Sequence, residues 1–347
     1  DHECSTESEA EEKIHKGMKV LIREGSSARN FDQLIRLIDR YPDKVMLCSD
    51  DLHPDDLLNG HLDRLIRRGV EAGVNFFNLY RAASLNPISH YQLNTGTLKP
   101  GDPADFIVAA AVDPFRVVST IVNGKAVFRD DRDHTELPAL TPLNNFHAKP
   151  ILPKDLGIIG ESGLYKIIQA YDGELLTDTK TAHLVANDGI VMNDLKHDIL
   201  KIVVINRYEP SKPALGWITG FGLSDGALAS SIAHDSHNII AVGTSDTALA
   251  DAINLIIRHS GGISAVGRDK SACLPLPVAG LMSVENAKTV GTQYAELSAF
   301  AKTLGSSMKA PYMALSFMAL LVIPHLKISD KGLFDGETFT FTDLKAI

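Results

Sequence analysis

The first 95 residues alternate between short apolar runs and stretches with helical spacing, and this alternation most constrains the fold. The run "KVML" at 44–47 is predicted to be a short strand that ends just before Asp50 and Asp51. The stretches on either side, "SSARNFDQLIRLIDRYP" and "HPDDLLNGHLDRLIRRGVEAG", have the apolar periodicity of amphipathic helices. Strands that alternate with helices predict parallel β/α units.

Residues 4–25 are predicted to begin with a helix. Ser5 or Thr6 can cap its first turn, which is rich in acidic residues that the helix dipole favours. Apolar residues then repeat at helical spacing, namely Ile14, Met18, Leu21 and Ile22. The stretch at 31–38 repeats the pattern with Phe31, Leu34, Leu37 and Ile38.

The pattern changes near residue 96, where Val/Ile runs are separated by the turn dipeptides Pro-Gly, Asp-Pro and Asn-Gly. A Pro-rich, aperiodic stretch follows, and then a second set of strands and helices. The sequence therefore predicts four segments: a β/α segment at 1–95, a small β domain at 96–136, a linker at 137–155 and a C-terminal domain at 156–347.

Composition excludes several classes of protein. The 347 residues carry a net charge of -9, which disfavours nucleic acid or an anionic membrane as a partner. The longest apolar run, at 313–324, is shorter than the ~20 residues that span a bilayer. The three cysteines are widely spaced and form no zinc-type pair. Together with the absence of a signal segment, they predict a cytoplasmic protein.

Two adjacent carboxylates at a strand end repel each other unless a cation or a proton lies between them. Asp50 and Asp51 are two such adjacent carboxylates after a predicted strand. The segment "DHE" at 1–3 places His2 just ahead of the first predicted helix, where it is a second candidate of the same kind. Imidazole nitrogen and carboxylate oxygen are suitable ligands for a divalent ion. The alternative is that both segments only cap helices, and spacing alone does not decide between the two.

Seven segments resemble the bacterial-type adenine deaminases of the amidohydrolase superfamily. They are "DHECST", "GMKVLIREGSSARNFDQL", "SDDLHPDDLL", "AASLNPISHYQL", "GTLKPGDPADFIV", "VNGKAV" and "IAHDSHNIIAVGTSD". The "GxLKPGxxADF" pattern marks only the superfamily, whereas the set as a whole is specific and extends over nearly the whole chain.

The resemblance implies an α/β fold: part of a (β/α)8 TIM-like hydrolase barrel, a small β domain and a C-terminal α/β (α+β) domain. It also implies hydrolytic deamination of adenine, with a divalent metal as cofactor. Mn2+ is favoured, with Fe2+ or Zn2+ as alternatives, and the complete enzyme would hold two ions. By motif match, His2 and Asp50 are metal ligands and Asp50 is also catalytic, while Asp51 and His53 orient Asp50. Adenine and a second copy of the chain are the expected partners.

The family's His-x-His pair, bridging carboxylate and a further His have no counterpart in this sequence, which matches the family only from its sixth barrel strand onward. We therefore expect the upstream segment to be missing or supplied by another chain. His2 and Asp50 alone are too few ligands for a tight metal site. The chain by itself is accordingly expected to be inactive.

Two further loops carry candidate residues. In "REGSSARN", Arg29 could face the substrate, although helix capping by Asn30 and Ser27 is favoured, and Arg23 and Glu24 could pair with each other. In "AHDSHN", the residues His234, Asp235 and His237 have no obvious capping or core role. They are predicted either to contact the substrate or to form a polar loop.

Two other functions remain open from the sequence. The chain could belong to another cyclic amidohydrolase of the superfamily, acting on a substrate such as dihydroorotate or a hydantoin. It could also be a degenerate, non-catalytic homologue. The "AHDSHN" domain argues against the first, because those relatives lack this C-terminal extension.

Overall fold

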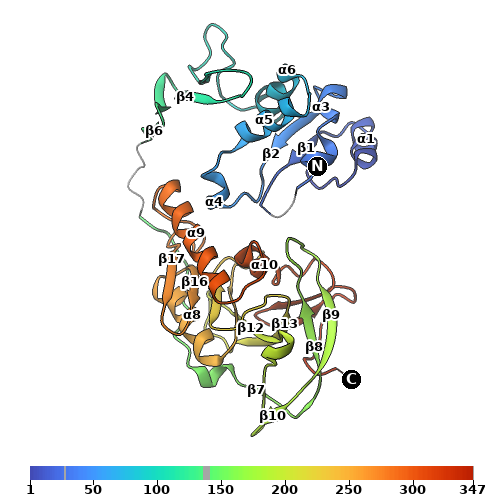
Figure 1. Cartoon of the computed structure of the whole chain (residues 1–347), viewed down its shortest axis with the longest axis vertical. Helices are drawn as coiled ribbons and strands as arrows, with labels where there is room; N and C mark the ends of the chain where they lie inside the picture. Colours follow the sequence, from blue (N-terminus) through green and yellow to red (C-terminus); the bar gives the residue numbers. More distant parts are fainter. Residues whose placement is uncertain (27–28, 136–140, 347) are drawn as a thin grey trace. The chain divides into compact units, whose positions relative to one another are not determined.

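The computed structural model describes residues 1–26, 29–135 and 141–346. The chain divides into two compact units, residues 1–139 and 140–347, which Figure 1 shows in blue to green and in green to red. Each unit is described by itself. The start of the predicted linker, at 137–140, lies outside the described residues.

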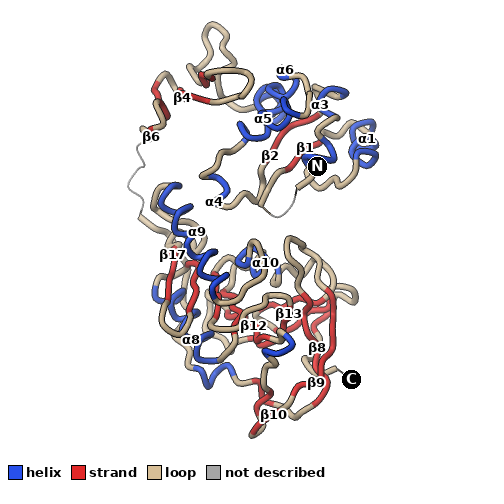
Figure 2. The backbone as a smooth tube through the Cα atoms, in the orientation of Figure 1, coloured by secondary structure: helices blue, strands red, loops and turns tan. Residues whose placement is uncertain are grey.

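Unit 1 is built on two parallel strands, β1 (Val20–Arg23) and β2 (Val45–Cys48), which pair with Arg23 opposite Cys48. Short helices surround them: α1 (Glu7–His15), α2 (Phe31–Leu34), α3 (Leu37–Arg40), α4 (Pro54–Leu57), α5 (Leu62–Glu71), α6 (Phe76–Tyr80), the π-helix η1 (Arg81–Leu85) and α7 (Asn86–Tyr91). Figure 2 shows the two strands in red among these helices. The strand residues Val20, Ile22 and Val45 are fully buried, because helices cover the small sheet.

The predicted N-terminal helix is confirmed, but it is shorter than expected. Thr6 caps α1 by accepting a hydrogen bond from the Glu9 amide. The helix ends at His15, and Gly17 follows with a φ of +91°, a conformation that suits glycine. The prediction that Met18, Leu21 and Ile22 continue the helix is therefore wrong, because Leu21 and Ile22 lie in β1.

The single helix predicted at 26–41 is also wrong, since the structure has two short helices there, α2 and α3. The Ile38 amide bonds to the Ile35 carbonyl instead of the Leu34 carbonyl, so the chain tightens between the helices. The predicted apolar face is nevertheless confirmed, because Phe31, Leu34, Leu37 and Ile38 are all buried. Residues 27 and 28, at the start of this stretch, lie outside the described residues.

A four-stranded antiparallel sheet completes unit 1. Its strands follow one another in chain order: β3 (Phe106–Ala109), β4 (Val117–Val122), β5 (Lys125–Arg129) and β6 (Arg132–Asp133). The Asn123–Gly124 turn joins β4 to β5, and both residues have positive φ, as the Asn-Gly dipeptide indicates.

Unit 2 contains an eight-stranded sheet in the order β17-β16-β14-β15-β12-β13-β8-β9. Its neighbouring strands are antiparallel except for β13 and β8. The strands are β8 (Gly163–Gln169), β9 (Asp178–Leu184), β12 (Leu200–Ile205), β13 (Ala214–Thr219), β14 (Ala227–Ser230), β15 (Ile239–Gly243), β16 (Gly262–Val266) and β17 (Ser271–Pro275).

Helices cover both faces of this sheet. Leu200, Ile202 and Val204 of β12 pack in one core with α9 (Ala287–Thr303) and α10 (Pro311–Phe317). The alternating residues Val203 and Ile205 pack in another core with α8 (Asp246–Arg258). A strand that is buried on both faces reads as a continuous apolar run, and "KIVVI" is such a run.

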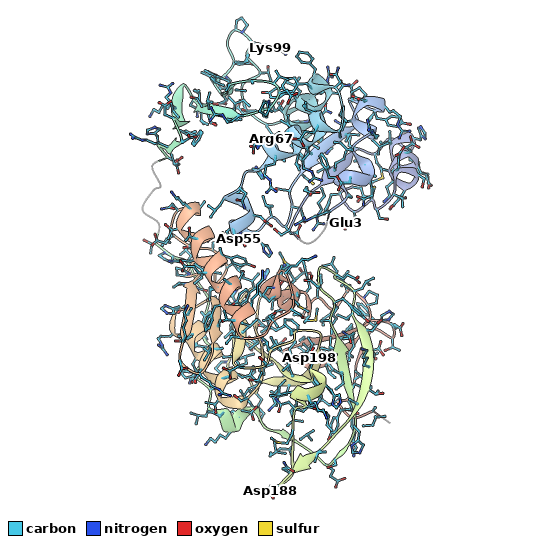
Figure 3. The ribbon with its side chains drawn as sticks, in the orientation of Figure 1. Glu3, Asp55, Arg67, Lys99, Asp188 and Asp198 are labelled. Carbon is cyan, nitrogen blue, oxygen red and sulfur yellow. The ribbon has the colours of Figure 1, made fainter. Side chains whose placement is uncertain are left out.

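Smaller elements complete unit 2. They are the 3-10 helices η2 (Pro153–Leu156) and η3 (Leu195–His197), the sheet of β7 (Ile158–Ile159), β10 (Ala186–Asn187) and β11 (Ile190–Val191), and the sheet of β18 (Leu326–Ser329), β19 (Gly332–Asp335) and β20 (Thr340–Phe341). Asp198, labelled in Figure 3, follows η3, and its carboxylate accepts hydrogen bonds from the Gly220 and Gly222 amides. Within the described ranges, no helix is long and apolar enough to cross a membrane.

Candidate active site

The segments that carry His2 and Asp50 come together in unit 1. Asp50 lies in the loop after β2, and the Leu21 amide of β1 donates to the Asp1 carbonyl, which places the first residues beside β1. The His2 Nε2 atom is 3.8 Å from the Asp50 Oδ1 atom. Carboxyl ends of parallel strands are the usual place for such a site.

Buried Asn30 ties these segments together. Its Oδ1 accepts a hydrogen bond from the Arg23 amide at 2.7 Å, and its Nδ2 donates to the Cys4 carbonyl at 2.9 Å. In addition, the Asn30 amide donates to the Arg23 carbonyl. Asn30 is at the N-cap of α2, but its side chain makes no capping bond there. The predicted capping role of Asn30 is therefore wrong, and that of Ser27 lies outside the described residues.

Arg23 supplies a cation between the two adjacent carboxylates. Its Nη2 atom is 2.6 Å from Asp50 Oδ2 and 3.1 Å from Asp51 Oδ1, and its Nη1 atom is 2.6 Å from Glu3 Oε1. Arg23 is buried at 5% exposure and the Asp51 side chain is 10% exposed, so water screens this ion pair poorly, whereas the more exposed Glu3 and Asp50 pairs are screened. The expected pairing of Arg23 with Glu24 is wrong, because Glu24 pairs with Arg68.

Asp51 and His53 are held more deeply than Asp50. The Asp51 side chain is 10% exposed, against 41% for Asp50. Gly25 makes room for Asp51, since a Cβ atom at residue 25 would lie 1.5 Å from Asp51 Oδ1. His53 is buried, and burial lowers the pKa of its imidazole, with partial compensation from Asp55 and Asp51. His53 is therefore neutral at neutral pH.

The residues present fit part of a divalent metal site. Metal–nitrogen and metal–oxygen bonds are about 2.0–2.2 Å long, so two atoms 3.8 Å apart can bind one ion. Two ligands do not complete a coordination shell. Among the described residues, one group of three potential metal ligands has its ligand atoms within 4.8 Å of one another, namely Asp1, Cys4 and Glu9. Lys13 already pairs with Asp1 and Glu9, so this group is an ion-pair cluster.

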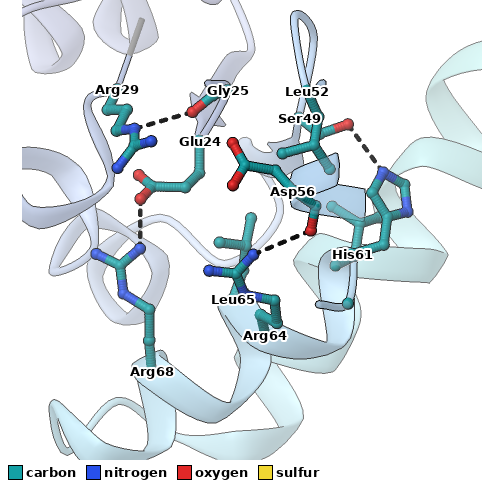
Figure 4. A pocket seen from close by; sticks show the side chains of 12 residues that line it. Glu24, Gly25, Arg29, Ser49, Leu52, Asp56, His61, Arg64, Leu65 and Arg68 are labelled. Carbon is teal, nitrogen blue, oxygen red and sulfur yellow. Dashed lines mark hydrogen bonds and ion pairs between the residues drawn. The ribbon is translucent and has the colours of Figure 1, made fainter. Parts of the chain in front are cut away.

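A small polar pocket adjoins this site, and Figure 4 shows it. Loops after β1 and β2 form one side and α5 the other, and its polar lining comprises Glu24, Arg29, Ser49, Asp56, His61, Arg64 and Arg68. Arg29, which the sequence singled out, donates from Nε to the Gly25 carbonyl at 2.9 Å. His61 Nε2 lies 2.8 Å from the Ser49 hydroxyl, which links α5 to the residue before Asp50.

His234, Asp235 and His237 lie in unit 2, in the loop before β15. The His234 ring stacks on Phe317 of α10 at 5.2 Å, and its centroid is 5.6 Å from that of His237. His237 Nδ1 is buried and has no hydrogen-bond partner. Burial, followed by His234 and Arg207, lowers the pKa of His237, so its imidazole is neutral at neutral pH.

Sequence reasoning missed the residues that support this loop. Arg207 is 2% exposed, and it donates to the Ala279 carbonyl and the Tyr208 hydroxyl. Tyr208 in turn donates to the Ser236 carbonyl at 2.9 Å. Gly280 lacks a side chain because a Cβ atom there would lie 1.9 Å from Arg207 Nη1. The sequence feature that could have identified these residues is the apolar strand "KIVVI", which is followed directly by the polar residues Asn-Arg-Tyr.

Comparison with known proteins first defines a class. The amidohydrolase family model matches residues 4–127, which include β1, β2 and Asp50 but begin after His2. The model of the adenine deaminase C-terminal domain matches residues 174–340, which include most of unit 2. The chain is thus an α/β protein of the amidohydrolase class.

Sequence identity to curated relatives defines the class more closely. The chain is 48% identical to the adenine deaminase of Salinibacter ruber, aligned over 99% of the chain and 63% of that protein. It is 46% identical to the adenine deaminase of Methanosarcina mazei, over 100% and 65%, and 42% identical to that of Borreliella burgdorferi, over 99% and 64%. Nearly the whole chain is therefore similar to part of these adenine deaminases, and it spans 63% to 65% of the three relatives.

A solved structure, the β-aspartyl dipeptidase of Fervidobacterium islandicum AW-1, resembles a smaller part of the chain. It aligns with 37% of this chain and 38% of that one, at a TM-score of 0.31 and 20% identity. A likeness of this size carries no argument about the site.

Proposed function

We propose that this chain takes part in the hydrolysis of adenine to hypoxanthine and ammonia. One observation carries the proposal: His2 Nε2 and Asp50 Oδ1 converge at 3.8 Å beside two parallel strands, in a chain that is 48% identical to an adenine deaminase over 63% of that protein. The match of residues 174–340 to the adenine deaminase C-terminal domain favours adenine over a cyclic amide as substrate.

The cofactor of the proposed reaction is a divalent metal ion. We propose Mn2+, with Fe2+ or Zn2+ as alternatives, and two ions in the complete enzyme. His2 and Asp50 would contribute ligands of the type that these ions accept. When bound, such an ion lowers the pKa of water and makes it a nucleophile near neutral pH.

Asp50 is the proposed proton carrier. Its carboxylate would accept a proton from the attacking water and deliver it towards the ring or the leaving amine. Arg23 holds Asp50 Oδ2 at 2.6 Å, which leaves Oδ1 on the side of His2. It remains a prediction that Asp51 and His53 orient Asp50. Asp51 would act through Arg23, because it pairs with the same guanidinium.

The remaining assignments are proposals as well. Arg29 stays a predicted substrate contact, as do His234, Asp235 and His237; the neutral His237 imidazole suits a hydrogen bond to a neutral base. A homo-oligomer and a cytoplasmic location stay predictions. So do the segment boundaries at 95, 136 and 155, whereas the two compact units divide between residues 139 and 140.

The Asp50→Asn variant tests the proposed function. Asp50 has a φ of +48°, and Asn tolerates this conformation well, so the fold is expected to persist. The test uses a version of the protein that spans the whole length of its relatives. The rate at which adenine absorbance is lost in the presence of Mn2+ should fall at least about 100-fold in a variant that lacks its general acid/base. Far-UV circular dichroism checks the fold.

Asp55→Asn is the matched control, because Asp55 lies nearby in the first turn of α4 and its carboxylate accepts a hydrogen bond from the Asp56 amide. Its turnover should stay near the wild-type value. Turnover retained by Asp50→Asn would contradict the assignment of Asp50. Absence of turnover in the wild-type form of that longer version, with Mn2+ added, would favour a non-catalytic homologue.

A further inference from the structure

Arg23 joins two loops that carry the proposed metal ligands. Its guanidinium contacts Glu3, next to His2, through Nη1, and it contacts Asp50 and Asp51 through Nη2. We propose that Arg23 is a positioning residue for Asp50: it holds Oδ2, so that Oδ1 alone is left to face His2 and a metal ion. This inference rests on the proposed function, because it assigns a role within the same site.

The backbone of Arg23 is fixed, which a positioning residue requires. Its amide and its carbonyl both bond to Asn30, at 2.7 and 2.9 Å. The carbonyl of Cys48, its neighbour across the sheet, accepts a hydrogen bond from the Glu24 amide. Arg23 therefore projects from the end of a paired strand.

The side chain of Arg23 is fixed as well. Asp51, which is 10% exposed, binds the guanidinium from the buried side, and the missing side chain of Gly25 leaves space for it. Asp50, at 41% exposure, is bound on the open side. A planar guanidinium held by a buried carboxylate orients the second carboxylate more strictly than a lysine ammonium can.

Removing Arg23 should change the affinity for a metal cation, and the direction of the change depends on the role of Arg23. A purely electrostatic role and a positioning role predict opposite directions. The three carboxylates of Glu3, Asp50 and Asp51 and the one guanidinium leave a local net charge of about -2 when His2 is neutral. Deleting the guanidinium makes this charge more negative, which should tighten the binding of a cation. If Arg23 positions Asp50, its loss should weaken that binding, because Asp50 becomes free to turn.

The test uses a version of the protein that spans the whole length of its relatives. It measures Mn2+ affinity, by electron paramagnetic resonance of free Mn2+, in the wild type and in Arg23→Met, Arg23→Lys, Asp51→Asn and Asp50→Asn. Loss of an orienting partner costs about 10- to 100-fold in metal affinity. We expect this weakening in Arg23→Met and a smaller one in Arg23→Lys and Asp51→Asn. Arg40→Met is the control, since Arg40 also bridges two carboxylates, Glu7 and Glu11, and should keep wild-type affinity.

The outcomes separate the inference from the proposed function. Unchanged or tighter Mn2+ binding in Arg23→Met overturns the role of Arg23, provided that Asp50→Asn still abolishes binding. If Asp50→Asn has no effect on the affinity, the metal site itself is wrong and the proposed function fails with it. Should Arg23→Met fail to fold, Asp51→Asn decides, because it leaves Arg23 in place and removes its buried anchor.

Discussion

At the scale of single residues, Asp50 and Asp51 are neighbours in the sequence but differ in environment. Asp51 is packed against Arg23, and Asp50 is turned towards His2. The sequence predicted that a cation was needed between them, but not that Arg23 would supply one. That contact depends on the pairing of Arg23 with Cys48 across β1 and β2, and β1 itself was not recognised. A pairing register of this kind is a tertiary property.

Lys327 in β18 offers a residue-scale prediction, because burial lowers the pKa of its ammonium to about 8. The residue is 0% exposed, and its Nζ donates to the Leu175 carbonyl. A depressed pKa means that stability from this group is present above pH 10.5 and is lost as the pH falls through 8. Lys327→Met should therefore raise the free energy of unfolding at pH 7 by about 1–3 kcal/mol.

Urea unfolding at pH 7 and at pH 10.5 checks this. The gain over wild type should shrink at the higher pH, because the wild-type lysine is then neutral in the folded state and half neutral in the unfolded state. The exposed Lys180→Met should show no such pH dependence. If Lys327→Met raises the free energy of unfolding equally at both pH values, the burial of a charged Lys327 is not the cause of the gain.

At the scale of elements, periodicity and caps predicted most helices but not the start of the sheet. The helix α1, its Thr6 cap and strand β2 are confirmed. Strand β1 was missed because Ile14, Met18, Leu21 and Ile22 fit a helical spacing by chance, and Gly17 was the local signal that the helix stops. A buried four-residue strand is too short for periodicity to identify.

Asn30 provides a prediction at this scale, because its side chain connects β1 to the segment around Cys4. Asn30→Ala leaves the buried Arg23 amide without its side-chain acceptor and the Cys4 carbonyl without its donor. Such losses cost about 1–3 kcal/mol of stability. Denaturant unfolding followed by far-UV circular dichroism should show this cost.

Asn59→Ala is the control for Asn30. Asn59 is exposed, and its Nδ2 donates to the Asp55 carbonyl within the same turn. Its removal should change stability by less than about 0.5 kcal/mol. Equal effects of the two substitutions would show that the Asn30 bridge does not stabilise the loop.

At the scale of the whole molecule, the two units have separate cores. One apolar cluster lies within residues 4–115, and three further clusters lie within residues 151–344. The change in pattern near residue 96 and the Pro-rich stretch after 137 predicted a division of the chain. The order of the eight strands in unit 2 could not be predicted, since it depends on long-range pairing.

Because their cores are separate, the two units are expected to unfold in separate transitions. Tryptophan fluorescence can report on one of these transitions. Trp217 in β13 is the single tryptophan, and it is fully buried in unit 2. Leu34 is fully buried in unit 1, so Leu34→Ala should cost about 2–5 kcal/mol there. We expect the variant to lower the midpoint of one circular dichroism transition and to leave the tryptophan fluorescence midpoint unchanged.

The converse substitution, Ile253→Ala in α8, should shift the fluorescence midpoint, because Ile253 is buried in a core of unit 2. If Leu34→Ala moves the fluorescence midpoint as far as the circular dichroism midpoint, the two units unfold as one. The separate-core interpretation would then be incorrect.

The missing side chain at Gly25 has a consequence for protein engineering. Positions 25 and 51 compete for the same few cubic ångströms, although 26 positions separate them in the chain. In a library that randomises either loop alone, most variants would place two side chains in the same space. A chimera that takes only one loop from a distant homologue would combine residues at positions 25 and 51 that do not fit together. Both loops have to be exchanged together.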